Sequence, residues 1–387
     1  MTPAARYAAA IVILDRAMAG APAERELTSW ARGNRFAGSK DRAAIRDIVY
    51  DGLRKLRSYQ HASGLDGARG VIVGQLIALD IDILDVFNGL GYAPLPLSGE
   101  ELVVVERDKR EMSRAVALDI PDWLEPVFDG DDDYMRLKNR APIDLRVNLK
   151  KATREQAASS LLRDGIETDP VDGVVSALRV RGQTRKIPMA AAYINGTVEL
   201  QDAGSQALVA AMNIPDGGRV LDYCAGGGGK TLAMASVASK TTQFQAYDLD
   251  QDRLKALSER AARAGAHVEL LQNDPVGQSQ TFDLVVLDVP CSGSGAWRRN
   301  PDAKWKLTQE RLNELVLMQA KILSDAQPLV AQGGQISYMT CSLFQRENEL
   351  QVKDFLLQNP DWVARISHIF GLKDGNDGFF ISILERK

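Results

Sequence analysis

The spacing of hydrophobic and polar residues changes twice along the chain. In the first third, apolar residues recur every three or four positions, as at Ile45, Val49 and Leu53, which is the period of a helix face packed on a core. From Asp144, short strand-like stretches mix with a helix. From Gln201 onward, apolar runs alternate with helical stretches, as βαβ units do. The pattern predicts a helical region, a small α+β region and an α/β region.

We place the three predicted domains at 1–125, 126–200 and 201–387. The acidic run at 129–133 is expected to form a loop or linker. In the middle domain we expect strands at 145–148, 176–180 and 196–200 and a helix at 152–164. In the last domain we expect strands at 219–223, 244–248, 284–288, 335–340 and 378–384 and helices at 231–238 and 252–264.

Composition narrows the class of protein. Hydrophobic residues make up 45% and charged residues 25% of 387 residues, which is ordinary for a soluble globular chain. The 3 cysteines form no CxxC pair, so we expect no zinc or other metal site and a reducing, cytoplasmic location. No apolar run reaches the ~18 residues of a membrane span, so no membrane partner is expected.

The net charge of −4 argues against a nucleic-acid partner, but the charge is unevenly distributed. Residues 1–60 carry an excess of lysine and arginine over aspartate and glutamate, and attraction to phosphates is local. Arg42, Arg46, Arg54 and Arg57 lie mostly off the apolar stripe of this region. They form either an RNA-contacting face or a solvated charged face.

Four ligand-type or reactive residues follow the predicted strands of the α/β region. Asp222, Asp248, Asp288 and Cys341 each stand at the end of one strand. In an open α/β sheet, ligands bind beside the carboxyl ends of the strands. These four side chains are therefore expected to share one site.

A glycine-rich loop follows the first of these strands, at Cys224–Thr231. Glycines let the backbone approach a ligand before a helix begins. The spacing fits neither GxxxxGK[ST] nor GxGxxG, which excludes those two phosphate-binding motifs. Asp248, some twenty residues further on, is placed to accept from ribose hydroxyls, unless it is only a helix N-cap.

Two cysteines follow two of the strands, Cys291 after a proline and Cys341 between Thr340 and Ser342. A single cysteine of this kind is most often a buried, inert thiol. Two of them at neighbouring strand ends, beside a glycine-rich loop, indicate nucleophilic chemistry instead.

The chain from residue 146 onward resembles the Nol/Nop/Sun family of RNA cytosine-5 methyltransferases. The matching segments occur in family order, at Arg146–Asn148, Gln201–Gln206, Asp222–Thr231, Asp248, Arg253–Leu254, Asn273–Asp274, Asp288–Gly295, Arg298–Trp305, Tyr338–Ser342, Glu347–Glu349 and Asp377–Phe380. Ser39–Arg42 and Val49–Arg54 resemble a NusB-like RNA-binding domain.

This resemblance implies the fold and the activity. The fold class is α/β, with a Rossmann-like S-adenosylmethionine-dependent methyltransferase sheet preceded by an all-α NusB-like domain and a small α+β domain. The expected reaction is methylation of carbon 5 of a cytosine in RNA, with 16S ribosomal RNA as substrate and S-adenosyl-L-methionine as cofactor. A cytoplasmic monomer is expected.

The resemblance also assigns roles to residues. Cys341 is expected to be the nucleophile, and Cys291 is expected to assist release of the product. From its own chemistry, Asp288 is expected to bond to the exocyclic amine or ring nitrogen of the cytosine. Lys230 favours the thiolate, or else it contacts phosphate or is a helix-surface charge. The cofactor is expected to contact Cys224, Ala225, Gly226, Gly227, Gly228, Gly229, Lys230, Asp248, Arg253, Asp274 and Asp288. Four basic residues are expected either to meet RNA phosphates or to lie in a solvated loop, namely Arg298, Arg299, Lys304 and Lys306.

Two other classes of function compete with this interpretation. A non-catalytic RNA-binding ribosome-assembly factor would have no use for both Cys291 and Cys341. A DNA cytosine-5 methyltransferase would attack from the Pro-Cys position, which is Cys291 here, and the Thr-Cys-Ser element disfavours it.

Overall fold

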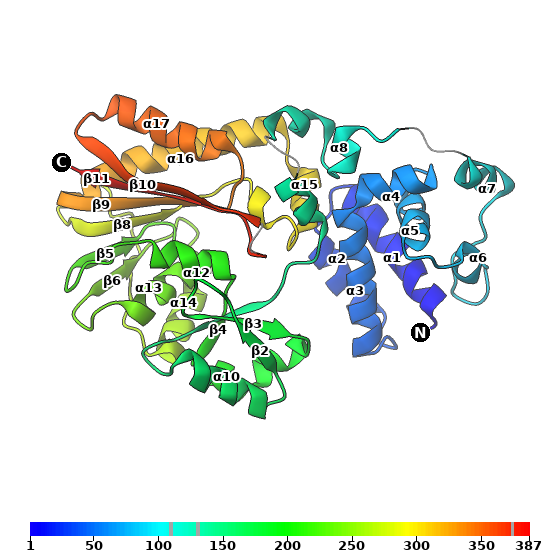
Figure 1. The fold of residues 1–387 in the computed structure, drawn as a ribbon, viewed down its shortest axis with the longest axis horizontal. Helices are drawn as coiled ribbons and strands as arrows, with labels where there is room; N and C mark the ends of the chain where they lie inside the picture. Colours follow the sequence, from blue (N-terminus) through cyan, green and yellow to red (C-terminus); the bar gives the residue numbers. More distant parts are fainter. Residues whose placement is uncertain (108–110, 129–131, 373–374) are drawn as a thin grey trace. The chain divides into compact units, whose positions relative to one another are not determined.

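The chain divides into two compact units in a computed structural model that describes residues 1–107, 111–128, 132–372 and 375–387. The first unit comprises Met1–Arg140 and Trp297–Gln309, and the second comprises Ala141–Ala296 and Glu310–Lys387 (Figure 1). Residues 129–131 of the expected linker lie outside the described part. The three-part division by sequence stays a prediction.

The first unit is helical, as predicted. Its helices are α1 (Pro3–Met18), α2 (Ala23–Gly33), α3 (Ser39–Arg54), α4 (Leu56–Ser63), α5 (Gly67–Ala78), α6 (Ile83–Val86), α7 (Gly99–Glu106), α8 (Arg114–Ala117), α9 (Asp132–Met135) and α15 (Pro301–Lys306). The predicted apolar stripe of α3 is confirmed, since Ile45, Val49 and Leu53 are buried in one core. Among the described residues, no helix has the length and apolarity needed to cross a membrane.

The basic residues beside that stripe are largely engaged within the unit. The Arg46 guanidinium forms a bidentate pair with Glu24, with N–O distances of 2.6 and 2.7 Å. Arg57 pairs with Asp122 at 2.5 Å, and Arg54 is buried. Of the two interpretations, an arginine face on α3 that is free for RNA is therefore the less well supported.

Residues 297–309 pack within the helical unit although they interrupt the second unit in sequence. The indole N–H of Trp305 donates to the Leu53 carbonyl at 2.8 Å. The Asp302 carboxylate accepts from the Ala23 N–H at 3.2 Å, at the first residue of α2. Lys304 is 2% exposed and donates to the Arg54 carbonyl at 3.3 Å. The expectation that Lys304 meets RNA phosphates or lies in a solvated loop is wrong, because its side chain is buried. The same correction applies to Arg298, which is 3% exposed.

We expect Lys304→Met to stabilise the protein near neutral pH. Burial lowers the pKa of Lys304 to about 7, and Lys138 and Arg54 add to this while Asp119 opposes it. A pKa below its unfolded value means that folding loses stability as pH falls from about 10.5 toward 7, by roughly a few kcal/mol. Methionine keeps most of the length of the side chain and has no charge to lose solvation.

The measurement is the melting temperature of the full chain at pH 9.5 and pH 7. The wild type should lose more stability between the two pH values than Lys304→Met. Exposed Lys353 provides the matched control, since Lys353→Met removes a charge without a buried site. Equal pH dependence in the wild type and Lys304→Met would contradict the prediction.

The second unit begins with a small antiparallel sheet of order β2-β3-β1-β4. Its elements are β1 (Asp144–Val147), α10 (Arg154–Arg163), β2 (Glu167–Pro170), β3 (Ala177–Arg181), α11 (Ala191–Ile194) and β4 (Val198–Leu200). The three predicted strands and the helix are confirmed. β2 escaped prediction because its sequence, Glu-Thr-Asp-Pro, is polar and contains proline, which an edge strand tolerates.

A seven-stranded sheet of order β10-β11-β9-β8-β5-β6-β7 forms the rest of the unit. Its strands are β5 (Arg219–Asp222), β6 (Gln243–Ala246), β7 (Glu269–Leu270), β8 (Phe282–Asp288), β9 (Val330–Thr340), β10 (Trp362–Phe370) and β11 (Phe379–Arg386). Its helices are α12 (Ala203–Ala210), α13 (Gly229–Val237), α14 (Gln251–Ala264), α16 (Gln309–Ala326) and α17 (Glu349–Gln358). The five neighbouring strands β7, β6, β5, β8 and β9 are parallel. β11 lies between β9 and β10 and runs antiparallel to both.

Helices cover both faces of this sheet (Figure 1). In β8, Val285 and Leu287 pack with α16 and α17, whereas Leu284 and Val286 pack with α12 and α13. Both faces are apolar because both are covered, which explains the nearly continuous hydrophobic run predicted as a parallel strand. Strand order reverses between β5 and β8, and such a switch point opens a ligand crevice at the carboxyl ends of the strands.

Candidate active site

The polar residues predicted at strand ends lie along one edge of the large sheet. Asp222 and Asp288 are the last residues of β5 and β8, Cys341 directly follows β9, and Asp248 lies two residues beyond β6. These four strands are parallel neighbours, so their carboxyl ends meet at one edge. The sequence prediction of a shared edge is therefore confirmed in geometry.

Cys291 and Cys341 face each other across the ends of β8 and β9. Their Sγ atoms lie 3.4 Å apart, and both residues are partly exposed. Pairing brings Asp288 of β8 beside Met339 of β9, and the Gly295 N–H donates to the Cys341 carbonyl at 3.0 Å. The chain therefore turns back sharply after Pro290 and presents both thiols at one place.

The environment keeps Cys291 protonated. Its hydrogen bond with the Cys341 sulfur raises the pKa of Cys291 well above the ordinary value, and burial adds to this because it disfavours the thiolate. The charge of Glu347 acts in the same direction. Cys291 is therefore a thiol near neutral pH, able to hold or pass on a proton beside Cys341.

Lys230 and Asp288 form an ion pair beside the thiols. The ammonium of Lys230, at the start of α13, donates to Asp288 Oδ2 at 2.6 Å, and its side chain is 10% exposed. Burial alone would lower the pKa of Lys230, but Asp288 and then Cys341 outweigh it, so the pKa of Lys230 lies above its ordinary value. Lys230 thus brings a persistent positive charge close to Cys341, which fits the predicted role of favouring a thiolate.

The loop at Cys224–Gly229 has the backbone that its glycines predict. Gly226 and Gly228 have φ of +51° and +75°, in the left-handed region that favours glycine. A Cβ on Gly228 would lie 2.1 Å from Leu257 Cδ1, whereas a Cβ on Gly229 would have Gln201 Nε2 at 3.8 Å as its nearest neighbour. Gly228 is therefore required by both conformation and packing, and Gly229 is not.

We expect Gly228→Ala to destabilise the protein by roughly 2–5 kcal/mol and to distort the loop. The left-handed conformation costs alanine about 1–2 kcal/mol and the clash with Leu257 about 1–3 kcal/mol. Gly229→Ala is the matched control, since Gly229 is the first residue of α13 and alanine suits a helix. Chemical denaturation of both variants measures the difference, and equal stabilities would contradict the prediction.

Asp248, which follows the neighbouring strand β6, holds the glycine-rich loop through a hydrogen bond. Its Oδ2 accepts from the Gly226 N–H at 2.7 Å, and its Oδ1 accepts from the Asp250 N–H at 2.9 Å. The N-cap of α14 is Asp250, whose side chain accepts from the Asp252 N–H, so Asp248 is not that N-cap. Arg253 approaches the Asp248 carboxylate at 3.5 Å and is 60% exposed.

Asp274 lies further along the same edge and is exposed. Its carboxylate accepts from the Tyr223 hydroxyl at 3.1 Å and from the Val276 N–H at 3.0 Å. Burial raises the pKa of Tyr223, and Asp274 adds to this, so the hydroxyl stays protonated as a donor. The contact with the cofactor that the sequence predicts for Asp274 stays a prediction.

Two features, one just before the glycine-rich loop and one within it, fit a ligand that carries hydrogen-bond donors. Asp222 Oδ1 is buried and has no hydrogen-bond partner among the described residues, while its Oδ2 accepts from the Thr231 hydroxyl at 2.6 Å. Burial raises the pKa of Asp222 to about 7, although the bond from Thr231 opposes this. The glycines beside it leave the loop backbone free of side chains.

Sequence reasoning gave no role to Arg146, Gln201 and Glu347, which support this edge of the sheet. The Arg146 guanidinium, on β1, is 4% exposed and donates to the Gly229 carbonyl at 2.8 Å and to the Gln201 side chain at 2.5 Å. Glu347 is fully buried behind the two cysteines. All three stand in segments that match the family, and this match was the available signal.

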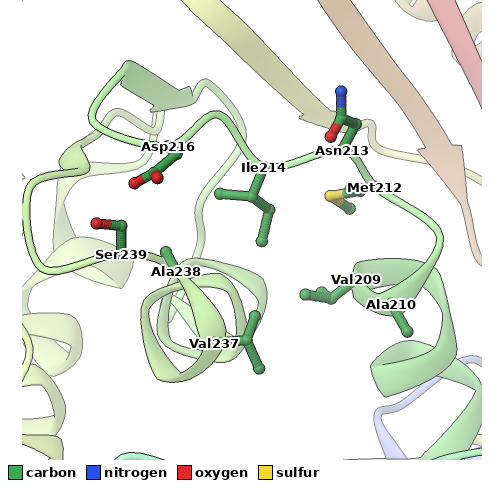
Figure 2. Close-up of a pocket in the computed structure, with 9 residues that line it drawn as sticks. All are labelled: Val209, Ala210, Met212, Asn213, Ile214, Asp216, Val237, Ala238 and Ser239. Carbon is green, nitrogen blue, oxygen red and sulfur yellow. The ribbon is translucent and has the colours of Figure 1, made fainter.

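A pocket of about 570 Å³ opens at the opposite edge of the sheet. It lies where the chain enters β5 and leaves α13, with nine lining residues between Val209 and Ser239, and Asp216 is the charged one (Figure 2). It holds none of the predicted site residues. Within the described ranges, no group of three histidine, cysteine, aspartate or glutamate side chains is arranged to bind a metal ion.

Comparison with known proteins agrees with this geometry. Residues 209–384 match the model of the family described as 16S rRNA methyltransferase RsmB/F. Ribosomal RNA small subunit methyltransferase B of Pectobacterium atrosepticum is 34% identical over 258 residues, which cover 63% of this chain and 60% of that protein. The chain thus spans about 60% of the length of the methyltransferases B from Pectobacterium that it matches. The protein of the same name from Erwinia tasmaniensis is 27% identical over 398 residues, covering 90% of this chain and 92% of that protein.

Solved structures confirm the predicted fold. The crystal structure of PH0851 has a TM-score of 0.76 at 21% identity and covers 100% of this chain and 99% of that one. The structure of NSun6 from Pyrococcus horikoshii with SFG has a TM-score of 0.61 at 17% identity and covers 68% of this chain and 97% of that one.

Proposed function

We propose that this chain, whose residues 209–384 form a methyltransferase domain of the RsmB/F family, methylates carbon 5 of a cytosine in 16S ribosomal RNA. The observation that carries the proposal is the 3.4 Å separation of Cys291 Sγ and Cys341 Sγ at the sheet edge, next to the Lys230–Asp288 pair. A binding module has no use for two thiols in this arrangement.

Two sulfur atoms suit a reaction that must first activate carbon 5. Cytosine carbon 5 is a weak nucleophile, and addition of the Cys341 thiolate to carbon 6 turns the ring into an enamine. When bound, S-adenosylmethionine supplies the electrophilic methyl group that carbon 5 then attacks. Loss of the carbon 5 proton and cleavage of the bond between Cys341 Sγ and carbon 6 restore aromaticity and free the product.

Cys291 is suited to the last of these steps. It is protonated near neutral pH, and its sulfur lies against that of Cys341, so it can give its proton to the Cys341 sulfur as the bond to carbon 6 breaks and take up the proton that leaves carbon 5. Cys341, next to the cation of Lys230, is suited to the attack itself. Cys291 is thus suited to proton transfer, and the cation of Lys230 lies beside the sulfur assigned to the attack.

Asp288 and Lys230 would hold the cytosine. Asp288 Oδ2 binds Lys230, and the Asp288 side chain is 34% exposed. The other carboxylate oxygen can therefore accept from the exocyclic amine of the cytosine. Uracil has a carbonyl at that position and would face the carboxylate with an acceptor. A site that leaves a polar group unpaired rejects the wrong base strongly.

The glycine loop and its neighbours would hold the cofactor. The backbone from Cys224 to Gly229 would pass along it, Asp222 Oδ1 would accept from its ammonium group, and Asp248 would accept from its ribose hydroxyls. Asp274 would accept from its adenine amine. This assignment rests on the unpaired Asp222 oxygen and on the resemblance.

The RNA must present an unstacked base to reach this edge. Extrusion costs a few kcal/mol and is cheapest for single-stranded or looped RNA. The proposed substrate is ribosomal RNA, the proposed location is the cytoplasm, and the proposed working form is a monomer. The NusB-like helical unit would contribute RNA binding.

Transfer of tritium from labelled S-adenosylmethionine tests the proposal. Incubation of the full chain with 16S ribosomal RNA should label the RNA, and nuclease digestion should recover the label in 5-methylcytosine. DNA of the same sequence should stay unlabelled. Label in DNA alone would favour the DNA enzyme, and binding of RNA without any label would favour the assembly factor.

A further inference from the structure

A single buried carboxylate joins the two cysteine segments from behind. Glu347, in the short 3₁₀ helix η6 (Gln345–Glu347), is 0% exposed. Its oxygens accept from the N–H and the hydroxyl of Ser292, at 2.8 and 2.5 Å, and from the hydroxyl of Ser342 at 2.5 Å. Ser292 directly follows Cys291, and Ser342 directly follows Cys341, so each cysteine is one residue away from the same carboxylate.

Further hydrogen bonds fix the Glu347 carboxylate and connect it to other residues of the two cysteine segments. The Gln319 amide, on α16, donates to Glu347 Oε1 and to the Pro290 carbonyl, both at 2.9 Å. The Ser294 hydroxyl accepts from the Leu343 N–H at 2.8 Å and bonds with the Ser342 hydroxyl at 3.2 Å. The two turns that carry the cysteines are therefore connected through one polar cluster.

No lysine or arginine within the described ranges forms an ion pair with Glu347. Four hydrogen bonds satisfy the carboxylate instead, and a charge held in this way without a cation keeps its full effect on its surroundings. The groups that face Cys291 are Cys341 just after β9, Glu347 from η6, the Tyr338 hydroxyl from β9 and the N–H of Gly293. Tyr338 is uncharged, because burial raises its pKa well above the ordinary value.

We propose that Glu347 is a positioning residue which, through Ser292 and Ser342, holds Cys291 and Cys341 at their separation and gives the two cysteines different roles. The inference rests on the proposed function. The Ser342 bond sets the position of the attacking sulfur, and the Ser292 bond sets the position of the sulfur that assists release. The charge of Glu347 disfavours a thiolate at Cys291 and leaves attack to Cys341, which lies beside Lys230.

Glu347→Gln separates the charge from the shape. The amide oxygen can still accept from the Ser292 N–H and from Gln319, and the amide nitrogen can donate to the hydroxyl oxygens of Ser292 and Ser342. After the two serine hydroxyls reorient, the geometry should be retained and only the negative charge should be lost. Asp354→Asn on α17 is the matched control, because Asp354 is an exposed carboxylate seven residues further along the chain.

The first measurement uses the free protein and needs no RNA. The rate at which iodoacetamide alkylates Cys291 is followed against pH and resolved from the other cysteines by peptide mass spectrometry. In Glu347→Gln the midpoint for Cys291 should move to lower pH by about one unit, with unchanged circular dichroism. In Asp354→Asn it should stay at the wild-type value. An unchanged midpoint in Glu347→Gln would overturn the electrostatic part of the inference.

The second measurement follows the covalent adduct with RNA on denaturing gels. Ser342→Ala should slow adduct formation by about tenfold to a hundredfold, and Ser292→Ala should slow adduct resolution by a similar factor, because a misplaced reacting group loses rate steeply. Equal effects of both serine variants on both steps would show a general structural role and overturn the inference. If Cys291→Ala, in which release should stall, forms no adduct at all, the proposed function fails, while the alkylation profile of the wild type and Glu347→Gln still decides the effect of Glu347 on Cys291.

Discussion

Replacing Cys341 with alanine should abolish methyl transfer, whereas replacing Cys291 with alanine should leave the enzyme joined to its RNA. Without the Cys341 sulfur, carbon 5 is never activated, and the rate should fall by at least about a thousandfold, as it does when other covalent nucleophiles are removed. Without the Cys291 thiol, attack and methylation proceed but release stalls. The 3.4 Å contact between the two sulfurs is the reason to expect such opposite results from neighbouring atoms.

The measurement combines tritium transfer with denaturing gel electrophoresis. Cys291→Ala should transfer about one methyl group per enzyme and give a slow-migrating band that survives denaturation and disappears after ribonuclease treatment. The double variant Cys291→Ala/Cys341→Ala should give no such band. Full turnover by Cys341→Ala would refute the assignment, and an adduct trapped in that variant would reverse the two roles.

Asp288→Asn should lower kcat/KM for methyl transfer by about a hundredfold to a thousandfold. The change removes the acceptor proposed for the cytosine amine and leaves the 10% exposed ammonium of Lys230 without its counter-ion. Loss of one preorganised electrostatic contact in an active site has effects of this size. Burial then acts unopposed by Asp288, so the pKa of Lys230 should fall.

The pH dependence of stability gives a second check on this pair. A raised pKa for Lys230 means that the pair stabilises the fold below the unfolded lysine value of about 10.5, and that this contribution is lost as pH rises through the folded value. Asp288→Asn should remove it. Asp252→Asn is the matched control, since it breaks the exposed Lys255–Asp252 pair on α14 and should leave the rate unchanged. Wild-type kcat/KM in Asp288→Asn would contradict the proposed role.

The two competing functions make different demands on the same residues. A non-catalytic assembly factor would tolerate Cys341→Ala and Asp288→Asn without loss of function. A DNA enzyme that attacks from the Pro-Cys position would lose its adduct in Cys291→Ala and keep it in Cys341→Ala. One set of variants therefore separates all three functions.

The amino-acid sequence by itself predicted the architecture and the candidate reacting groups. The change from helical to alternating periodicity predicted the helical region and the parallel sheet, because apolar spacing reflects which faces must be buried. The order of strands and helices then placed Asp222, Asp288 and Cys341 at one edge, since the carboxyl ends of parallel strands share it. The edge strands β2, β7 and β10 escaped prediction, because they are short, polar or largely exposed and lack a buried pattern.

Only the tertiary structure decided what surrounds those groups. Residues 297–309 pack within the helical unit, and Asp302 accepts from an N–H that is 279 positions away in sequence. Glu347 joins the segments of Cys291 and Cys341 through hydrogen bonds that span 55 and 5 positions. Local sequence patterns indicate which face of a helix or strand is buried, but they do not indicate which distant polar groups meet at that face. The partners of a buried charge are set by the packing of the whole domain.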